Sequence, residues 1–227
     1  MEEKIYSVAV DGPSGAGKST LSKAVAAELG IVYVDTGAIY RTIGYYVFTK
    51  GISPKDAPAV IAILPELEIE MRYGDDGLQR MYLNGQDVTT EIRLPQISMY
   101  ASDVSAIPEV RVFLLEMQRE MARRSCVIMD GRDIGTVVLP AAEVKIFLTA
   151  DVEVRAHRRW KELCQRGTER PYEEVLREIE ERDYNDSHRA AAPLKQADDA
   201  VLVETSELTF DESKERMLQV IREKVGL

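Results

Sequence analysis

One short stretch of this chain combines glycines, a lysine and a hydroxyl at the spacing of a phosphate-binding loop. Residues 12–19 read Gly-Pro-Ser-Gly-Ala-Gly-Lys-Ser and fit the pattern G-x-x-x-x-G-K-[ST] at every fixed position. The glycines of such a loop let backbone N–H groups turn toward phosphate oxygens, and the helix that follows adds partial positive charge. We therefore expect Lys18 to reach the terminal phosphates of a nucleotide and the Ser19 hydroxyl to hold Mg²⁺.

Carboxylates and arginines gather at two further positions where the chain is expected to leave a strand. Asp35 is followed by Thr36 and Gly37, and residues 130–133 read Asp-Gly-Arg-Asp. The second motif places two carboxylates and an arginine within four residues. We expect it to belong to a site, although a turn closed by a salt bridge would have the same composition.

Arginines also share helix faces in the C-terminal half of the chain. Arg155, Arg158 and Arg159 have the spacing i, i+3, i+4, and Arg182, Asp186 and Arg189 have the spacing i, i+4, i+7. Arginine matches phosphate oxygens with its rigid fork, and phosphoryl transfer depends on positioned positive charge rather than on a covalent nucleophile. Together with the loop, this pattern predicts a small-molecule kinase. The alternative for each helix is a charge lattice that only supports helicity; for Arg155 we favour a functional role.

The charge balance limits the classes of partner. A net charge of −10 over 227 residues disfavours a large nucleic-acid footprint, which needs a broad basic surface. Basic residues still concentrate in one segment, which indicates a small anionic ligand: Arg155, Arg158, Arg159, Lys161, Arg166, Arg170, Arg177, Arg182 and Arg189. We expect no membrane span and no signal peptide, because no apolar run is long enough and the first strand follows Met-Glu-Glu-Lys at once. Two cysteines without metal-type spacing fit a reducing cytosol.

Strand and helix patterns alternate along most of the chain and place these motifs at strand ends. The expected core strands are residues 5–10, 31–35, 126–130, 144–148 and 200–203. The expected helices are residues 20–29, 38–50, 55–64, 91–106, 108–124, 152–165, 172–185 and 211–224. This alternation predicts an α/β fold with a five-stranded parallel sheet, helices on both of its faces and ligands at the carboxyl ends of its strands.

The period changes between the second helix and the later strands. Leu67, Ile69, Met71 and Tyr73 alternate with charged residues, and Asp76-Gly77 and Asn84-Gly85 are hairpin turn signals. We expect residues 66–90 to form a small antiparallel meander. The predicted organisation is a core domain of residues 1–65 and 106–227, a helical lid at about 155–170, and an inserted subdomain at 66–105.

At these motifs the sequence resembles the bacterial cytidylate kinases, a branch of the nucleoside monophosphate kinases. The resemblance covers nearly the whole chain. Its matching stretches are residues 11–18, 35–41, 90–93, 130–138, 155–159 and 181–183, followed by Asp186 and Arg189. The meander is similar to the enlarged monophosphate-binding subdomain of the bacterial type.

The resemblance implies a reaction and a set of site residues. The reaction is transfer of a phosphoryl group from ATP to CMP or dCMP with Mg²⁺, giving ADP and CDP or dCDP, by a monomer in the cytoplasm. The ATP phosphates are expected at Gly12, Pro13, Ser14, Gly15, Ala16, Gly17, Lys18, Ser19 and Thr20. CMP is expected at Thr36, Tyr40, Arg41, Ser102, Arg111, Arg132, Asp133, Arg182, Asp186 and Arg189. Lys18, Arg132, Arg158, Arg159 and Arg189 are the expected catalytic residues.

Within the CMP set the resemblance gives each group a part. Ser102, Arg111 and Asp133 are expected to face the cytosine, and Arg182 and Asp186 to hold the sugar hydroxyls. Arg41, Arg132 and Arg189 are expected to hold the CMP phosphate. Arg158 and Arg159 belong to the lid that closes over ATP.

Three other functions share part of the pattern. A GTPase switch would need an N-K-x-D guanine motif, which Asn84-Gly85 and Asn185-Asp186 do not supply. Another phosphate-loop kinase, acting on a nucleoside or a sugar-like acid, would not need several arginines for an acceptor phosphate. A ligand-sensing relative without catalysis is disfavoured by the presence of Lys18, Ser19, Arg132 and Arg189.

Overall fold

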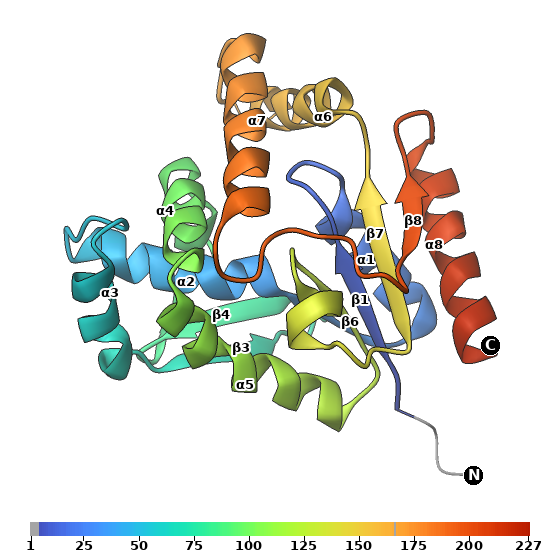
Figure 1. The fold of residues 1–227 in the computed structure, drawn as a ribbon, viewed down its shortest axis with the longest axis horizontal. Coiled ribbons are helices and arrows are strands. Elements are labelled where there is room, and N and C mark those ends of the chain that lie inside the picture. The colour runs from blue at the N-terminus through green and yellow to red at the C-terminus, as the bar shows by residue number, and fades with distance from the viewer. Residues whose placement is uncertain (1–4, 166) are drawn as a thin grey trace. The chain divides into compact units, whose positions relative to one another are not determined.

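The computed structural model describes residues 5–165 and 167–227, and Figure 1 shows the course of the chain. Arg166, one of the clustered arginines, lies outside the described residues. The chain forms two compact units. Unit 1 contains the residues up to Tyr33 together with Ala122–Leu227, and unit 2 is Val34–Met121. Unit 2 therefore extends on both sides of the range 66–105 that the sequence suggested for an insert.

The parallel sheet, which belongs to unit 1 except for the last two residues of β2, confirms the predicted five strands. Its order is β2-β6-β1-β7-β8, which spans β2 Val32–Asp35, β6 Val127–Asp130, β1 Ser7–Asp11, β7 Val144–Thr149 and β8 Val201–Glu204. Strand β1 pairs in parallel with β6 and with β7, and β7 pairs in parallel with β8. The parallel register brings the carboxyl ends of β1 and β6 to one edge, where Val10 lies opposite Asp130.

Helices α1 Lys18–Leu29 and α8 Phe210–Val225 pack on this sheet. Val8 and Val10 of β1 share one buried cluster with Val25 of α1 and Met217 of α8. The sequence starts α8 with a capping box, in which Thr209 and Glu212 satisfy each other's backbone N–H groups. Burial of this apolar cluster fixes the loop between β1 and α1 on a rigid base.

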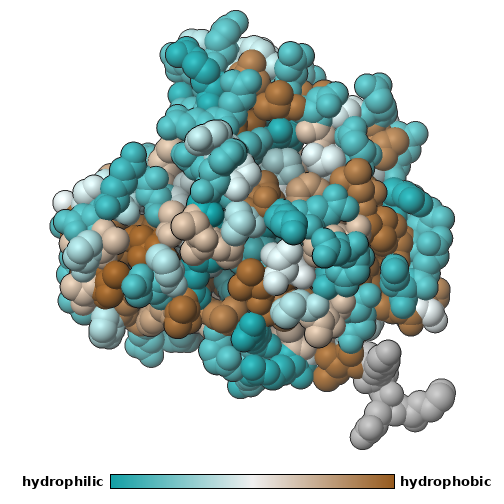
Figure 2. Space-filling view, viewed as in Figure 1, coloured by the Kyte–Doolittle hydropathy of each residue, from teal (hydrophilic) through white to brown (hydrophobic). Residues whose placement is uncertain are grey.

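Helices α6 Val152–Gln165 and α7 Tyr172–His188 form a hairpin with a small core of its own. Ala156 and Leu163 of α6 pack with Val175 and Ile179 of α7. The outer surface of this region, at the top of the view, is covered mainly by hydrophilic residues (Figure 2). The charged sequence of both helices thus forms solvated faces around a thin apolar seam.

Unit 2 contains the predicted antiparallel meander. Strands β3 Ile69–Tyr73, β4 Gln79–Leu83 and β5 Gln86–Asp87 pair in that order. Asn84 and Gly85, between β4 and β5, both have positive φ, as the two-residue hairpin turn requires. The helical elements of this part of the chain are α2 Thr36–Thr49, α3 Ala57–Ile63, η1 Leu64–Glu66, η2 Glu91–Arg93, α4 Pro95–Ser105 and α5 Pro108–Arg124, the last of which continues past the end of unit 2.

The sequence missed one element of unit 1. Residues Ile134–Val138, which follow the Asp-Gly-Arg-Asp motif, form a short π-helix, η3. A five-residue segment of this kind has no apolar periodicity to reveal it, because the wide turn is imposed by its neighbours.

Candidate active site

The phosphate loop of unit 1 leaves the end of β1 and enters the first turn of α1. Gly12 has φ 149°, and a Cβ placed there would lie 1.9 Å from the carbonyl oxygen of Leu148 in β7. Gly17, which caps α1, has φ 86°. Both positions require glycine, the first because of close backbone approach and the second because of its left-handed conformation. The motif spacing therefore encodes this backbone path directly.

Lys18 is buried in the loop, with 5% of its surface exposed. Its Nζ donates hydrogen bonds of 2.7 Å to the carbonyl oxygens of Gly12 and Pro13. Burial lowers the pKa of Lys18 well below its ordinary value, and the positive charge of Arg132 lowers it further. The ammonium is thus held inside the loop, close to the backbone that is predicted to surround the phosphates.

Ser19 contacts Asp130, the first residue of the Asp-Gly-Arg-Asp motif, for which the sequence predicted no separate role. Its Oγ donates a 2.8 Å hydrogen bond to Oδ2 of Asp130, and the Tyr33 hydroxyl donates a 2.9 Å hydrogen bond to Oδ1. The parallel register of β1 and β6 puts Asp130 beside the loop. A hydroxyl and a carboxylate at this distance are the hard oxygen donors that Mg²⁺ prefers. The signal for Asp130 was present in its position at the end of a core strand.

Asp11, the last residue of β1, fixes the segment that follows the Asp-Gly-Arg-Asp motif. Its two carboxylate oxygens accept hydrogen bonds of 2.8 and 2.7 Å from the backbone N–H groups of Ile134 and Gly135. Burial raises the pKa of Asp11 to about 6, against the two amide hydrogen bonds, which lower it. The start of η3 is therefore tied to the strand that precedes the phosphate loop.

The structure brings together the five predicted CMP-binding residues of unit 1. Arg132 Nε donates a 2.7 Å hydrogen bond to Oδ2 of Asp186. The other ion pairs are Arg182 Nε with Asp186 Oδ2 at 4.0 Å, Arg189 Nη1 with Asp186 Oδ1 at 4.0 Å, and Arg189 Nη2 with Asp133 Oδ1 at 3.5 Å. Burial favours a higher pKa for Asp186, but Arg132, Arg182 and Arg189 together hold it below its ordinary value. The cluster thus places three guanidinium groups around two buried carboxylates.

The three arginines of the α6 face have different surroundings. Arg158 donates to Thr205, just after β8, with 2.6 Å to the backbone oxygen and 3.2 Å to Oγ1. Arg159 pairs with Glu162 on its own helix at 3.2 Å. Arg155 is buried and pairs with Asp183 of α7. The helical spacing that predicted a common face therefore does not give the three residues common partners.

In unit 2, two arginines converge on the acid that caps α2. Asp35 accepts from the backbone N–H of Ala38 at 2.9 Å, and its Oδ2 lies 2.9 Å from Arg41 Nη2 and 2.8 Å from Arg93 Nη2. Burial favours a higher pKa for Asp35, but the two arginines lower it below its ordinary value. Arg41, which the family resemblance assigns to the CMP phosphate, is thus paired with an acid in this structure. Arg93 was not predicted as a site residue.

The remaining predicted residues of unit 2 lie on α2, α4 and α5. Thr36 is buried in the first turn of α2. The guanidinium carbon of Arg111 lies 5.4 Å from the ring centre of Tyr40. Arg111 Nη1 donates 3.1 Å to the carbonyl oxygen of Ser105, whose hydroxyl donates 2.8 Å to the carbonyl oxygen of Ser102. The structure therefore joins Tyr40, Arg111 and the Ser102 region in one cluster.

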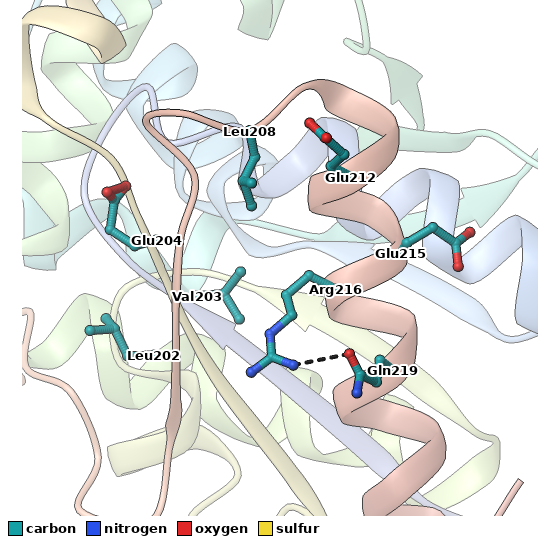
Figure 3. A pocket seen from close by; sticks show the side chains of 8 residues that line it. All are labelled: Leu202, Val203, Glu204, Leu208, Glu212, Glu215, Arg216 and Gln219. Atoms are coloured by element: carbon teal, nitrogen blue, oxygen red, sulfur yellow. Dashed lines mark hydrogen bonds between the residues drawn. The ribbon is translucent and has the colours of Figure 1, made fainter.

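A surface hollow of about 720 Å³ lies elsewhere in unit 1, between β8 and α8 (Figure 3). Leu202 and Leu208 line it together with polar residues of α8, where Arg216 donates a 3.0 Å hydrogen bond to Gln219. Its walls come from β8, the following loop and α8. It is therefore distinct from the cluster around the phosphate loop.

In residues 5–165 and 167–227, no helix has both the length and the apolar character needed to cross a membrane. Over the same residues, no group of three or more His, Cys, Asp and Glu side chains is arranged to hold a metal ion.

Comparison with known proteins places the chain in a family. The sequence model of the cytidylate kinase family matches residues 8–223. A cytidylate kinase of Caldicellulosiruptor bescii is 49% identical over 217 residues, covering 96% of each chain. A cytidylate kinase of Caldanaerobacter subterraneus is 49% identical over 215 residues, covering 95% of this chain and 94% of the relative.

Among solved structures, an uncharacterised protein from Eubacterium ventriosum has a TM-score of 0.53 at 10% identity, covering 95% of this chain and 98% of that one. At that identity the likeness concerns the fold alone. The family match spans residues 8–223, which contain every motif described above, and the relatives align over nearly the full length of the chain. This chain belongs to the cytidylate kinase family.

Proposed function

We propose that this protein transfers the γ-phosphoryl group of ATP to CMP or dCMP, forming ADP and CDP or dCDP. The observation that carries the proposal is the phosphate loop with its buried Lys18 in the same unit as a cluster of three arginines and two carboxylates. Phosphoryl transfer depends on positioned positive charge, because negative charge spreads over the moving group. The curated relatives that share this sequence at 49% identity are cytidylate kinases.

The proposed ATP site is the loop from Gly12 to Thr20. Its backbone N–H groups and the N-terminus of α1 bind the phosphates, and Lys18 moves its hydrogen bonds from loop carbonyls to phosphate oxygens. Arg158 and Arg159 of α6 supply further positive charge to the transferred group. Support for these roles comes from the buried position of Lys18 and the family resemblance of the α6 arginines.

The proposed CMP-binding residues fall into a cluster in each unit. In unit 1, Arg182 and Asp186 bind the sugar hydroxyls, Arg132 and Arg189 bind the phosphate, and Asp133 faces the base. In unit 2, Arg41 binds the phosphate with Thr36 beside it, and Ser102 and Arg111 face the base next to Tyr40. The ion pairs that now hold these arginines support the proposal, because anionic oxygens can replace carboxylates as their partners.

Mg²⁺ is the expected companion of ATP. Ser19 and Asp130 would hold it, since a hydroxyl and a carboxylate oxygen 2.8 Å apart suit a cation that binds through few protein oxygens and the phosphates. The ion supplies charge neutralisation at the phosphates when bound.

An ADP-release assay with five acceptors tests the proposal. AMP, CMP, dCMP, UMP and GMP are compared at equal concentrations with ATP and Mg²⁺, and chelation of the metal serves as a control. We expect rapid ADP release with CMP and dCMP and slow release with the other three. A preference for another acceptor, or release that does not depend on any acceptor, contradicts the proposal.

We further propose that the enzyme acts as a monomer in the cytoplasm, as the family resemblance implies. Analytical ultracentrifugation over a range of concentrations and fractionation of cells test the two statements. A concentration-independent dimer would contradict the first, and recovery with the membrane fraction would contradict the second.

A further inference from the structure

The two peptide groups that flank Ser14 in the phosphate loop are held from outside the loop by one ion pair. The backbone N–H of Ser14 donates a 3.1 Å hydrogen bond to Oδ1 of Asp183, and the backbone oxygen of Ser14 accepts a 2.8 Å hydrogen bond from Nη1 of Arg155. The same Nη1 pairs with Oδ2 of Asp183 at 2.5 Å. The N–H and the C=O of Ser14 are thus both hydrogen-bonded to side chains, and these two side chains also pair with each other.

The Arg155–Asp183 pair is held in place by a further hydrogen bond and by close packing against the loop. Arg155 has 6% of its surface exposed, and its Nε donates a 2.8 Å hydrogen bond to the backbone oxygen of Ala150, just after β7. A Cβ placed on Gly15 would lie 3.2 Å from both Cβ and the backbone oxygen of Arg155. Arg155 belongs to α6 and Asp183 to α7, so both helices of the hairpin reach the tip of the loop.

The geometry of the peptide bond connects these hydrogen bonds to phosphate binding. In a trans peptide the C=O of Ser14 and the N–H of Gly15 point in opposite directions. Because the Ser14 oxygen is turned toward Arg155, the Gly15 N–H is turned away from Arg155. A glycine-rich loop has many accessible conformations, and a loop that is already ordered loses less entropy when it binds its ligand.

We propose that Arg155 and Asp183 are positioning residues that set the orientation of the two peptide groups flanking Ser14 and thereby couple the α6–α7 hairpin to ATP binding. The inference rests on the proposed function, in which this loop binds the ATP phosphates. The two residues act through the loop backbone and do not themselves contact the substrate. Phosphoryl transfer is sensitive to such placement, because misplacing a group by about 1 Å can cost ~10²-fold in rate.

The test compares kinetic constants for the two substrates. We expect Arg155→Met and Asp183→Asn to raise the KM for ATP or the Kd of a fluorescent ATP analogue by about 10- to 100-fold, with a change in the KM for CMP of less than about threefold. Arg155→Lys should recover part of the loss, because it restores the charge. Glu178→Gln is the matched control: it removes an exposed pair with Arg170, 2.6 Å apart at the same hairpin, and should leave every constant unchanged.

Amide exchange gives a readout that does not require catalysis. In Asp183→Asn and Arg155→Met the amides of Ser14 and Gly15 should exchange faster, while those of the α1 interior keep the wild-type rate. If Arg155→Met does not fold, Arg155→Lys and Asp183→Asn still decide the question, because Asp183→Asn keeps an oxygen acceptor for the Ser14 N–H. ATP affinity and Ser14 exchange at wild-type values in folded variants overturn the inference, as does an equal rise of both KM values. A wild-type protein without CMP kinase activity would refute the proposed function, and exchange with analogue binding would still test the inference.

Discussion

At the residue scale, Lys18 is stabilised by its own loop. Its ammonium donates to the carbonyl oxygens of Gly12 and Pro13 in a buried setting that lowers its pKa. Phosphate oxygens in the same place would add opposite charge where water is largely excluded, and such preorganised charge is most effective in a site of low polarity. Lys18 therefore stabilises the loop conformation, and under the proposed function it also serves the reaction.

Lys18→Ala is expected to lower kcat by ~10²–10³-fold, because it removes a preorganised positive charge that would stabilise the transferred phosphoryl group. Far-UV circular dichroism should stay at the wild-type value, since the residue lies at a loop–helix junction. Lys23→Ala, an exposed position on the same helix, is the control and should keep full activity. Activity of Lys18→Ala within a few-fold of wild type would show that the loop does not bind the phosphates.

A substitution at Asp133 tests how the protein distinguishes cytosine from uracil in the acceptor nucleotide. Cytosine presents an N4 amino donor, whereas uracil presents an O4 acceptor, which a carboxylate would repel. We expect Asp133→Ala to lower kcat/KM for CMP at least ~10²-fold more than for UMP, since sites built on buried polar contacts discriminate on that scale. Some loss with both substrates should accompany this, because Asp133 also pairs with Arg189. An equal loss with CMP and UMP would assign Asp133 to that ion pair alone.

Asp11 predicts a pH dependence of stability. Its pKa is about 6 in the folded protein against 3.8 for the free side chain, so the folded state binds the proton more tightly. Its stabilising contribution is full below pH 3.8 and is lost as the pH rises through 6. Relative to Asp11→Asn, the wild-type free energy of unfolding should fall by roughly 2 kcal/mol between pH 4 and pH 7. Urea unfolding at both pH values measures this, and a difference that stays constant with pH would contradict it.

At the scale of elements, α2 and α4 are brought together by a glycine in the middle of α2. A Cβ placed on Gly44 would lie 2.8 Å from the backbone nitrogen of Ala101 in α4. This close contact fixes the position of α4, and with it Ser102, the next residue of α4, relative to Tyr40 and Arg41 of α2. Helix packing therefore determines the arrangement of the unit 2 cluster.

Gly44→Ala has two opposing effects on the free energy of unfolding, and their sum decides whether the protein becomes more or less stable. Alanine is favoured over glycine in a helix interior by ~1 kcal/mol. Overpacking against backbone costs about 1–3 kcal/mol, so we expect a net loss of stability of about 1 kcal/mol and a raised KM for CMP. Urea unfolding and steady-state kinetics measure the two quantities. A more stable protein with unchanged KM would show that α4 can move aside freely.

At the scale of the whole molecule, each unit has its own hydrophobic core. Ile43, Val47 and Leu114 are fully buried in unit 2, and Val10, Leu148 and Ile221 are fully or almost fully buried in unit 1. The residues proposed to bind nucleotides are divided between these two units. A ligand that engages all of them should therefore stabilise both.

A bisubstrate inhibitor that joins adenosine and cytidine through a phosphate chain should slow amide exchange in two segments. These are the lid at 155–170 and the proposed insert at 66–105, which we expect to close on the ligand because the reaction must exclude water. At a concentration 100 times its Kd the inhibitor should also stabilise the protein by ~2.7 kcal/mol. ATP alone is the control and should protect the phosphate loop without the insert. Equal exchange of 155–170 with and without the inhibitor would contradict closure.

The parts of this protein that depend on local spacing could be predicted from the amino-acid sequence. The motif at residues 12–19 specified a loop that needs glycine at positions 12 and 17, and the alternation of apolar runs predicted all five strands of the parallel sheet. Asn84-Gly85 predicted a hairpin turn that the structure contains. In each case the chemistry lies within a few neighbouring residues, so backbone sterics and periodicity are sufficient.

The contacts between side chains far apart in the sequence could be found only from the folded chain. Ser19 and Asp130 are 111 residues apart, Asp11 and Ile134 are 123 apart, and Ser14 and Asp183 are 169 apart. The i, i+3, i+4 spacing of the α6 arginines gave them one face but could not show that Arg155 turns inward to the loop while Arg159 pairs on the helix surface. Such contacts depend on strand register and helix packing, which are set by burial of the whole core and have no signature in any single stretch of sequence.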